Sequence, residues 1–291
     1  MDWFIVITTL NLAAIYGLLA IGISIIWSSL NMVNMAHGLT FAVSGYCAWL
    51  AATYISPHPA MVLVAGIAGG AVMGAIICSI AFLPLHDRPN FTVRSLITTL
   101  AINLIGIQLL LQIFGPRMKP LPRIFGTWSV SFGDTFLTGD KLGTILTSTI
   151  ILTLILVWIV KSRYGLQIRA MMQNPEGAAL VGIDVRFTAM RVMIITGALA
   201  GLASVLLSQT FFVNPNAGLQ PLIKGLIIAL VGGLGSMTGA VVAAFIMALI
   251  EAVTATYLSG QYVLIGQFLF IIIVLLIRPR GIGGMLDEFR E

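Results

Sequence analysis

The residues able to do chemistry are few and widely separated along this chain. The two cysteines, Cys47 and Cys78, stand alone in apolar segments, and no CxxC pair occurs. The histidines, His37, His58 and His86, lack the spacing of metal ligands. The sequence also lacks GxSxG, HExxH and the phosphate-binding pattern GxxxxGK[ST]. We therefore expect no catalytic residue, no metal site and no cofactor bound by this chain.

One carboxylate, Glu251, falls inside an apolar segment. Ion-coupled transporters place carboxylates within their membrane spans as ion sites, so Glu251 is the one feature that favours such a protein. A buried glutamate paired with a polar neighbour, or a glutamate near the membrane interface, explains the residue at least as well. A channel is disfavoured, because no ring of charges and no repeated carbonyl-filter motif occurs.

Two short segments interrupt the apolar pattern, Asn31 to Gly38 and Gly232 to Gly239. Aligning Met35–Gly38 with Ser236–Gly239 places a helix of small residues after each, which predicts a weak internal repeat built around broken helices. Unpaired backbone at membrane depth is tolerated only inside protein or along a water-filled path. The glycines could instead permit close helix packing. The candidate path residues of these segments are Asn34, His37, Gly38, Ser236, Thr238 and Gly239.

Three amide side chains lie in the apolar segment Ser95 to Phe114. They are Asn103, Gln108 and Gln112, and the two glutamines are four residues apart on one helix face. Asn103 and Gln108 are further candidates for the path, although hydrogen bonding to neighbouring helices would explain them as well.

A polar segment, Gln167 to Met190, contrasts with the rest of the chain. Within it, Asn174, Pro175 and Glu176 predict a helix start, and Gly182 predicts its end. A helix of about two turns is marginal alone and needs a groove to stabilise it. We expect Ala178, Ala179, Leu180 and Val181 to dock into a pocket of a cytoplasmic partner. A helix lying on lipid headgroups is the alternative, which the shortage of large apolar residues and lysines weakens.

Composition identifies the solvent as the lipid bilayer. Hydrophobic residues make up 59% of the chain and charged residues 9%, too few to cover the surface of a soluble domain, for which roughly 25% is usual. The basic residues lie between apolar runs and do not interleave with aromatic residues, so we expect no nucleic-acid binding. We predict an all-α polytopic membrane protein, one transmembrane domain over 1–291 with a cytoplasmic loop over 161–190.

The apolar runs predict eight full spans and one short segment, Leu222 to Val231. If the polar segment is cytoplasmic, most Lys and Arg of alternate loops lie on that side, with the N-terminus outside and the C-terminus inside. This topology requires the short segment to cross the membrane; if the segment is re-entrant instead, the last span and the C-terminal tail reverse. Lys224 falls at a membrane edge. The predicted full spans are Phe4–Trp27, Leu39–Ile55, Met61–Leu83, Ser95–Phe114, Leu142–Val160, Met190–Ser208, Gly239–Leu258 and Val263–Ile277.

Four stretches carry a resemblance to a known family. They are GLLAIGISIIWSSLNMVNMAHG at 17–38, YGLQIRAMMQNPEGAALVGIDV at 164–185, GLIIALVGGLGSMTGAVVAAF at 225–245 and RPRGIGG at 278–284. Along nearly its whole length the chain resembles the H-type permease subunit of branched-chain amino acid ABC importers, within the hydrophobic amino acid and amide uptake family.

The resemblance implies a set of partners in the bacterial cytoplasmic (inner) membrane. They are a related M-type permease, two cytoplasmic ATPase subunits that hold ATP and magnesium, and a periplasmic substrate-binding protein. It also implies that the helix at 174–182 couples the permease to the ATPase. Branched-chain amino acids, other amino acids, amides and urea all stay open as substrates.

Overall fold

The computed structural model describes residues 3–126, 128–132, 135–279 and 281–283. Within them the chain is built almost entirely of helices, as predicted. A short antiparallel hairpin in the loop 115–140 was not predicted; its strands are β1 (Ser129–Phe132) and β2 (Thr135–Thr138). The helices are α1 (Trp3–Leu30), α2 (His37–Tyr54), α3 (Pro59–Ile77), α4 (Phe91–Phe114), α5 (Gly139–Lys161), α6 (Arg163–Gln173), α7 (Pro175–Leu180), α8 (Val185–Phe211), α9 (Leu219–Gly232), α10 (Met237–Tyr257) and α11 (Val263–Ile277).

Seven helical stretches among the described residues are long and apolar enough to cross a bilayer. They comprise α1, α3 with its π-helical continuation to Phe82, α4, α5, α8, α10, and α11 with the 3-10 turn before it. One predicted full span, Leu39 to Ile55, corresponds to the 18-residue α2 and is not among the seven. The predicted short segment is α9, with 14 residues. The polytopic all-α prediction is confirmed.

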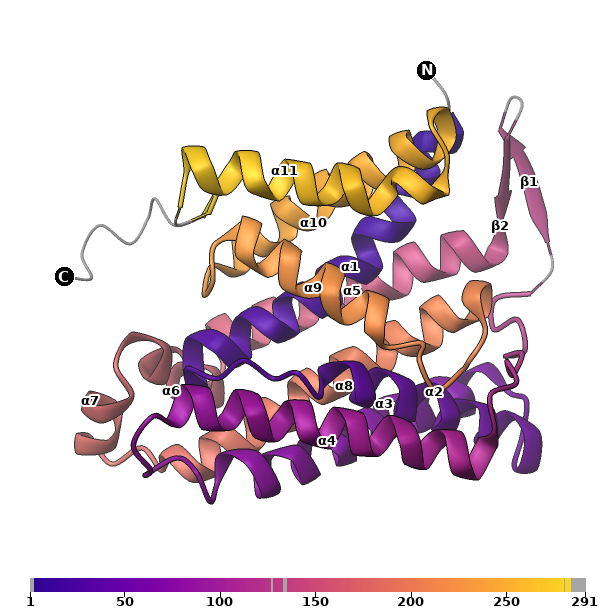
Figure 1. The fold of residues 1–291 in the computed structure, drawn as a ribbon. Helices are drawn as coiled ribbons and strands as arrows, with labels where there is room; N and C mark the ends of the chain where they lie inside the picture. Colours follow the sequence, from indigo (N-terminus) through magenta and orange to yellow (C-terminus); the bar gives the residue numbers. More distant parts are fainter. Residues whose placement is uncertain (1–2, 127, 133–134, 280, 284–291) are drawn as a thin grey trace.

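The two ends of the helical bundle differ in character. Helices α6 and α7 lie beyond one end, and the β-hairpin lies beyond the other (Figure 1). We call these ends the α7 side and the hairpin side. The N-terminus of α1 is on the hairpin side, and the described chain ends on the α7 side after α11. This agrees with the prediction that the two ends of the chain lie on opposite sides of the membrane.

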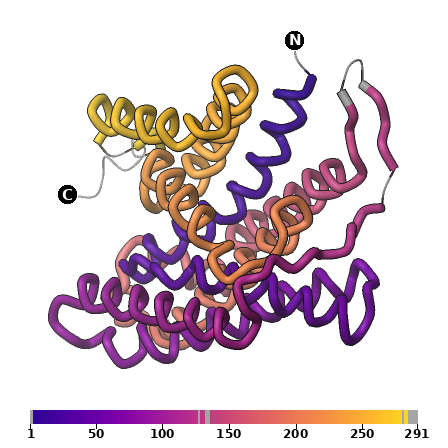
Figure 2. The backbone as a smooth tube through the Cα atoms, turned by 45° about the vertical axis from the view of Figure 1, so that its right-hand side comes forward, coloured from indigo at the N-terminus to yellow at the C-terminus, as the bar shows by residue number. Residues whose placement is uncertain are grey.

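Helices α1 and α8 form the centre of the bundle. Of the most apolar 18 residues of each span, 67% are buried within the chain in α8 and 50% in α1. The corresponding share is 17% in α4 and 17% in the span that contains α11. Helix α1 runs between the group formed by α2, α3 and α4 and the group formed by α10 and α11 (Figure 2). Helices α4 and α11 therefore present broad apolar faces to lipid or to other subunits.

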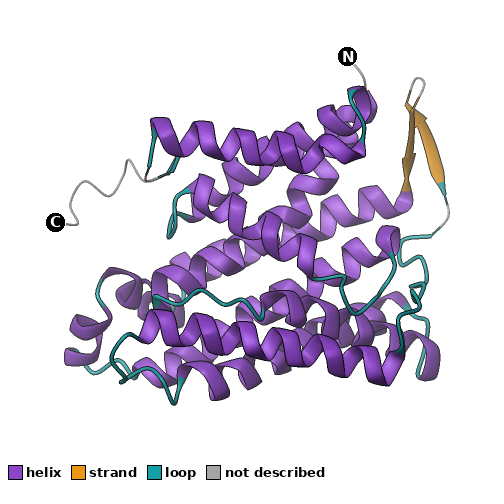
Figure 3. Ribbon diagram, in the orientation of Figure 1, coloured by secondary structure: helices purple, strands orange, loops and turns teal. Residues whose placement is uncertain are grey.

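The bundle contains an inverted repeat of four elements. Helices α1 to α4 and α8 to α11 follow the same order: a long central helix, an extended segment with a shorter helix, a helix packed on the other half's central helix, and an outer helix. Thus α3 packs on α8, and α10 packs on α1. The extended segments are 31–36 and 212–218, which Figure 3 shows as loops among the helices. The weak repeat predicted from sequence exists, but its second break is at 212–218 and not at 232–239.

Close backbone contact joins α3 to α8. A Cβ added at Gly70 would lie 2.1 Å from the carbonyl oxygen of Gly197, and one added at Gly197 would lie 2.3 Å from the oxygen of Gly70. Small residues at such crossings let helices pack where lipid supplies no hydrophobic driving force between them.

We predict that Gly70→Ala lowers the thermal stability of the purified protein, because overpacking a tight contact costs about 1–3 kcal/mol. The measurement is the midpoint temperature for loss of the monodisperse peak after heating in detergent. Gly17→Ala is the matched control, since its Cβ would meet Leu152 at an ordinary 3.8 Å. Equal midpoints for the two variants would contradict the close α3–α8 contact.

Candidate functional site

Helix α7 has the capped ends that the sequence predicted. The Oδ1 atom of Asn174 accepts a hydrogen bond from the Gly177 N–H at 2.9 Å, and Pro175 occupies the first helical position. At the other end Gly182 has φ of +87°, with N–H bonds from Gly182 to the Ala179 oxygen and from Ile183 to the Ala178 oxygen. This Schellman arrangement favours glycine, because other residues are strained at that φ.

The α7 surface presents apolar side chains outward. Leu180 is 89% exposed and Val181 77% exposed, at the tip of an element that lies beyond the spans. Ala179, Pro175 and Glu176 are exposed as well. Ala178 differs from the expectation, because it is buried against its own chain. Only the outward part of the predicted segment is therefore available for docking.

A clamp from α8 holds α6 in place. The guanidinium of Arg191 lies 4.1 Å from the ring centroids of both Tyr164 and Phe187, and it donates to Gln167 at 3.1 Å. Such cation–π contacts are worth about 0.5–2 kcal/mol each. Ser162 caps the start of α6 by accepting from the Gly165 N–H. The segment that carries α7 is thus coupled to α8, a central helix of the bundle.

The two extended segments, 31–36 and 212–218, contain the same type of local turn. In the first, Asn34 Oδ1 accepts from the Ala36 N–H at 3.0 Å, and the Asn34 carbonyl accepts from the His37 N–H at 3.3 Å. In the second, Asn214 Oδ1 accepts from the Asn216 N–H at 3.0 Å, and its carbonyl accepts from the Ala217 N–H at 3.0 Å.

Both turns continue into a glycine four residues after the asparagine, and these glycines touch. A Cβ added at Gly218 would lie 1.8 Å from the Gly38 oxygen, and one added at Gly38 would lie 2.9 Å from the Gly218 oxygen. Helix α2 runs from this contact toward the hairpin side, and α9 runs toward the α7 side (Figure 1). We call the contact between Gly38 and Gly218 the junction.

A side chain and a backbone segment from neighbouring elements pair with the extended backbone near the junction. Thr99 of α4 accepts from the Met35 N–H at 3.1 Å and donates to the Val33 carbonyl at 3.3 Å. Lys119 and Val213 exchange backbone hydrogen bonds at 2.8 and 2.9 Å. His37 is buried with its ring against Gly22 of α1, and its Nε2 atom has no hydrogen-bond partner within the described part of the chain.

The segment Ser236 to Gly239 lies apart from the junction and forms the turn between α9 and α10. Ser236 caps α10 by accepting from the Gly239 N–H at 3.0 Å, and its hydroxyl lies 3.4 Å from that of Thr238. Gly239 packs directly on the Gly232 carbonyl.

The chain after α11 closes this turn. The N–H of Ile282 donates to the Val231 oxygen at 2.8 Å, and that of Gly283 donates to the Gly232 oxygen at 2.9 Å. The glycine-rich stretch and the RPRGIGG stretch thus meet backbone to backbone; Arg280 and Gly284 of the latter lie outside the described residues.

The amides of α4 point in different directions. Asn103 is buried, and its Oδ1 atom has no partner among the residues described. Gln108 and Gln112 are exposed and line a shallow apolar hollow with Leu104 and Leu109 on the outer face of α4. The two glutamines share a face as predicted, but Asn103 does not join them.

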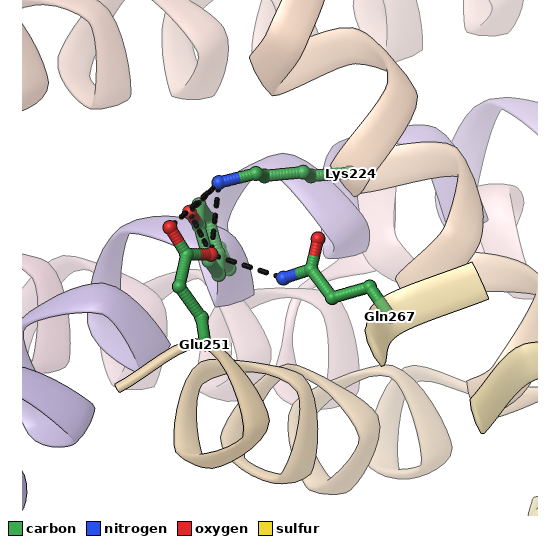
Figure 4. Close-up of polar contacts among 4 residues, drawn as sticks. Lys224, Glu251 and Gln267 are labelled. Atoms are coloured by element: carbon green, nitrogen blue, oxygen red, sulfur yellow. Dashed lines mark hydrogen bonds and ion pairs between the residues drawn. The ribbon is translucent and has the colours of Figure 1, made fainter. Parts of the chain in front are cut away.

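A buried polar cluster was not predicted as a site (Figure 4). The Lys224 ammonium of α9 lies 2.7 and 2.8 Å from the two carboxylate oxygens of Glu251 of α10, and it donates to the Tyr16 hydroxyl at 2.8 Å. Tyr16 and Gln267 donate to the carboxylate at 2.7 and 3.0 Å. Lys224 is 8% exposed, and the Glu251 side chain keeps 15% exposure, so Glu251 is a largely buried carboxylate paired with polar neighbours, as one of the sequence interpretations expected.

The cluster lies at the wall of a cavity of about 580 Å³. Lys224, Glu251 and Tyr16 line it together with residues near the hairpin-side ends of α8, α10 and α11. No sequence signal pairs Lys224 with Glu251, because they are 27 positions apart on different helices.

Comparison with known proteins identifies the family. Residues 5–277 match the family model described as branched-chain amino acid transport system / permease component. The chain belongs to this family. The resemblance inferred from the sequence motifs is thereby confirmed.

Relatives of this permease family match over nearly their full length. LivH of Escherichia coli K12, a high-affinity branched-chain amino acid transport system permease protein, is 29% identical over 287 residues, which cover 94% of this chain and 92% of LivH. The probable LivH permease of Methanocaldococcus jannaschii is 31% identical over 283 residues, covering 92% and 88%. The solved structure of PsaBC from Streptococcus pneumoniae in complex with Fab shares the fold, with a TM-score of 0.53 at 17% identity over 96% of this chain and 94% of that chain.

We predict that Arg191→Ala speeds amide hydrogen exchange across residues 163–173, because the Tyr164 ring and the Gln167 side chain of α6 lose their contacts with Arg191 of α8. The expected increase is about fivefold or more, which corresponds to a loss of roughly 1 kcal/mol in local stability. Arg186→Ala is the matched control, since its pair with Asp87 is exposed on both sides and exposed pairs contribute little. Unchanged exchange in α6 of Arg191→Ala would contradict the clamp.

Proposed function

We propose that this chain is one permease of an ATP-binding-cassette importer in the bacterial cytoplasmic membrane. In this proposal it forms half of the translocation path for branched-chain or closely related hydrophobic amino acids. Its family and its relatives, which are named as branched-chain amino acid permeases, support the substrate class. Its many apolar spans support the membrane location.

The observation that carries the proposal is the exposed tip of α7. Leu180 and Val181 form an apolar patch beyond the spans, on an element whose ends are capped and whose base is clamped to α8. Exposed apolar patches with polar surroundings mark binding sites, and an apolar helix commonly docks into a groove of its partner. A soluble ATPase subunit would supply that groove on the α7 side.

The remaining partners have candidate surfaces of their own. The outer face of α4 places Gln108 and Gln112 among apolar residues, and amides are costly to leave facing lipid. This favours a protein contact in place of lipid against α4. The hairpin side, with β1 and β2, would then receive a substrate-binding protein. ATP and magnesium would be held by the ATPase subunits, because this chain has no phosphate-binding loop.

The state of Glu251 favours ATP-driven over ion-driven transport. Its carboxylate is paired with Lys224 and hydrogen-bonded by Tyr16 and Gln267. An ion-coupled transporter needs a carboxylate free to take up a proton or sodium during the cycle. Reconstituted uptake should accordingly depend on ATP and be unaffected when ion gradients are collapsed.

We predict that Leu180→Asp abolishes association with the ATPase subunits while the spans still insert. The yield of copurified ATPase should fall about tenfold or more, because burying an unpaired carboxylate costs more than the ~1.4 kcal/mol of one decade in affinity. Met118→Asp, at an exposed apolar residue between α4 and the hairpin, is the matched control and should keep the ATPase bound. Normal copurification and uptake with Leu180→Asp would refute α7 as the docking element.

A further inference from the structure

The cavity beside Lys224 has the dimensions and position of a ligand site. Its volume, about 580 Å³, falls within the range of pockets that hold small molecules. Tyr16, which lines it, is at the middle of α1, so the wall that carries the charged cluster lies about halfway across the bundle. Transporters built from inverted repeats place their substrate sites at such a depth, beside broken helices.

The charged pair faces the cavity and is not sealed in the core. The side chains of Lys224 and Glu251 keep 10% and 15% of their exposure, and both line the cavity. A buried ion pair is seldom needed for stability, because apolar replacements of similar volume are often neutral or stabilising. The pair therefore calls for an explanation beyond helix packing.

The pair offers one charge of each sign within a single hydrogen-bonded cluster. An occupant with an anionic and a cationic group close together could exchange partners with Lys224 and Glu251 and leave both charges compensated. An occupant with a net charge would leave one of them unpaired at a cost of several kcal/mol. The arrangement thus selects for a zwitterion.

The rest of the cavity combines a polar rim with an apolar wall. Asn216 and Gln220 line it near the start of α9, where the positive end of the helix dipole favours a carboxylate. Phe41 and Leu207 line it as well and would contact an aliphatic side chain. These features match the two ends of a hydrophobic α-amino acid.

We propose that this cavity is a substrate subsite for a zwitterionic, hydrophobic α-amino acid, with Lys224 binding its carboxylate and Glu251 its ammonium. Tyr16 and Gln267 are positioning residues that hold the Glu251 carboxylate. The inference rests on the proposed function, which it deepens by assigning recognition of the amino acid backbone to the permease itself.

The test is protection of a thiol in the cavity wall. Ala255 is exposed and lines the cavity, so Ala255→Cys in a Cys47→Ala/Cys78→Ala background supplies a single reporter. The assembled transporter, in nanodiscs without binding protein, is labelled with a maleimide in the presence of L-leucine. We expect saturating leucine to slow labelling about tenfold, because ligands in such cavities bury most of their surface. Ser131→Cys on the hairpin is the control and should show no protection.

Two comparisons isolate the charged pair. The carboxylate analogue 4-methylpentanoate and the amine isopentylamine should not protect Ala255→Cys, since each has only one of the charges. The double substitution Lys224→Met/Glu251→Leu should still assemble and should lose the protection by leucine. Protection that persists in the assembled double variant would overturn the proposal.

Uptake by the same complex distinguishes a failure of the proposed subsite from a failure of the proposed function. If the parent imports leucine with ATP and binding protein but leucine never protects the thiol, the subsite is wrong and the proposed function stands. If the parent imports neither leucine nor isoleucine nor valine, the proposed function fails, and the subsite fails with it.

Discussion

The structure depends on the need to pair every backbone polar group at membrane depth. Two spans of this chain are interrupted by extended segments, which lipid cannot solvate. The turns at Asn34 and Asn214 supply part of the pairing locally, and Thr99 and Lys119 supply more from other elements. The rest of the extended backbone is kept away from lipid because the two segments meet at the Gly38–Gly218 junction. Neither glycine can carry a side chain without displacing the other's backbone, so the junction fixes where α2 and α9 begin.

The junction connects the polar cluster around Lys224 to the α7 side of the bundle. Helix α9 leaves the junction with Lys224 in its second turn, where it meets Glu251 of α10 and Tyr16 of α1. Helix α8 leads directly into the extended segment before α9, and its other end carries the Arg191 clamp on α6. Helix α8 and the backbone contact between Gly38 and Gly218 therefore form a continuous connection between the α7 side and the cavity.

Local signals in the sequence predicted local structure well. The α7 caps follow from Asn174, Pro175 and Gly182 alone, because caps depend on a few adjacent residues. The repeat was predicted with the wrong partner, because the glycines of 232–239 outweighed the shorter pattern Asn-x-x-x-Gly that 34–38 and 214–218 share. Glycine content marks a turn but not its depth. The pairing of Lys224 with Glu251 could not be predicted, since it depends on how α9 and α10 cross.

The most direct test of the account is whether the segment 212–218 runs back into the bundle along α2. A Cβ at Gly45 would lie 3.2 Å from the Val213 side chain, which is within reach of a disulfide. The measurement is cross-linking of Gly45→Cys/Val213→Cys in a Cys47→Ala/Cys78→Ala background under mild oxidation, read as a linked peptide by mass spectrometry. The account predicts near-complete linkage. Two free thiols that both react with maleimide, and no linked peptide, would contradict it.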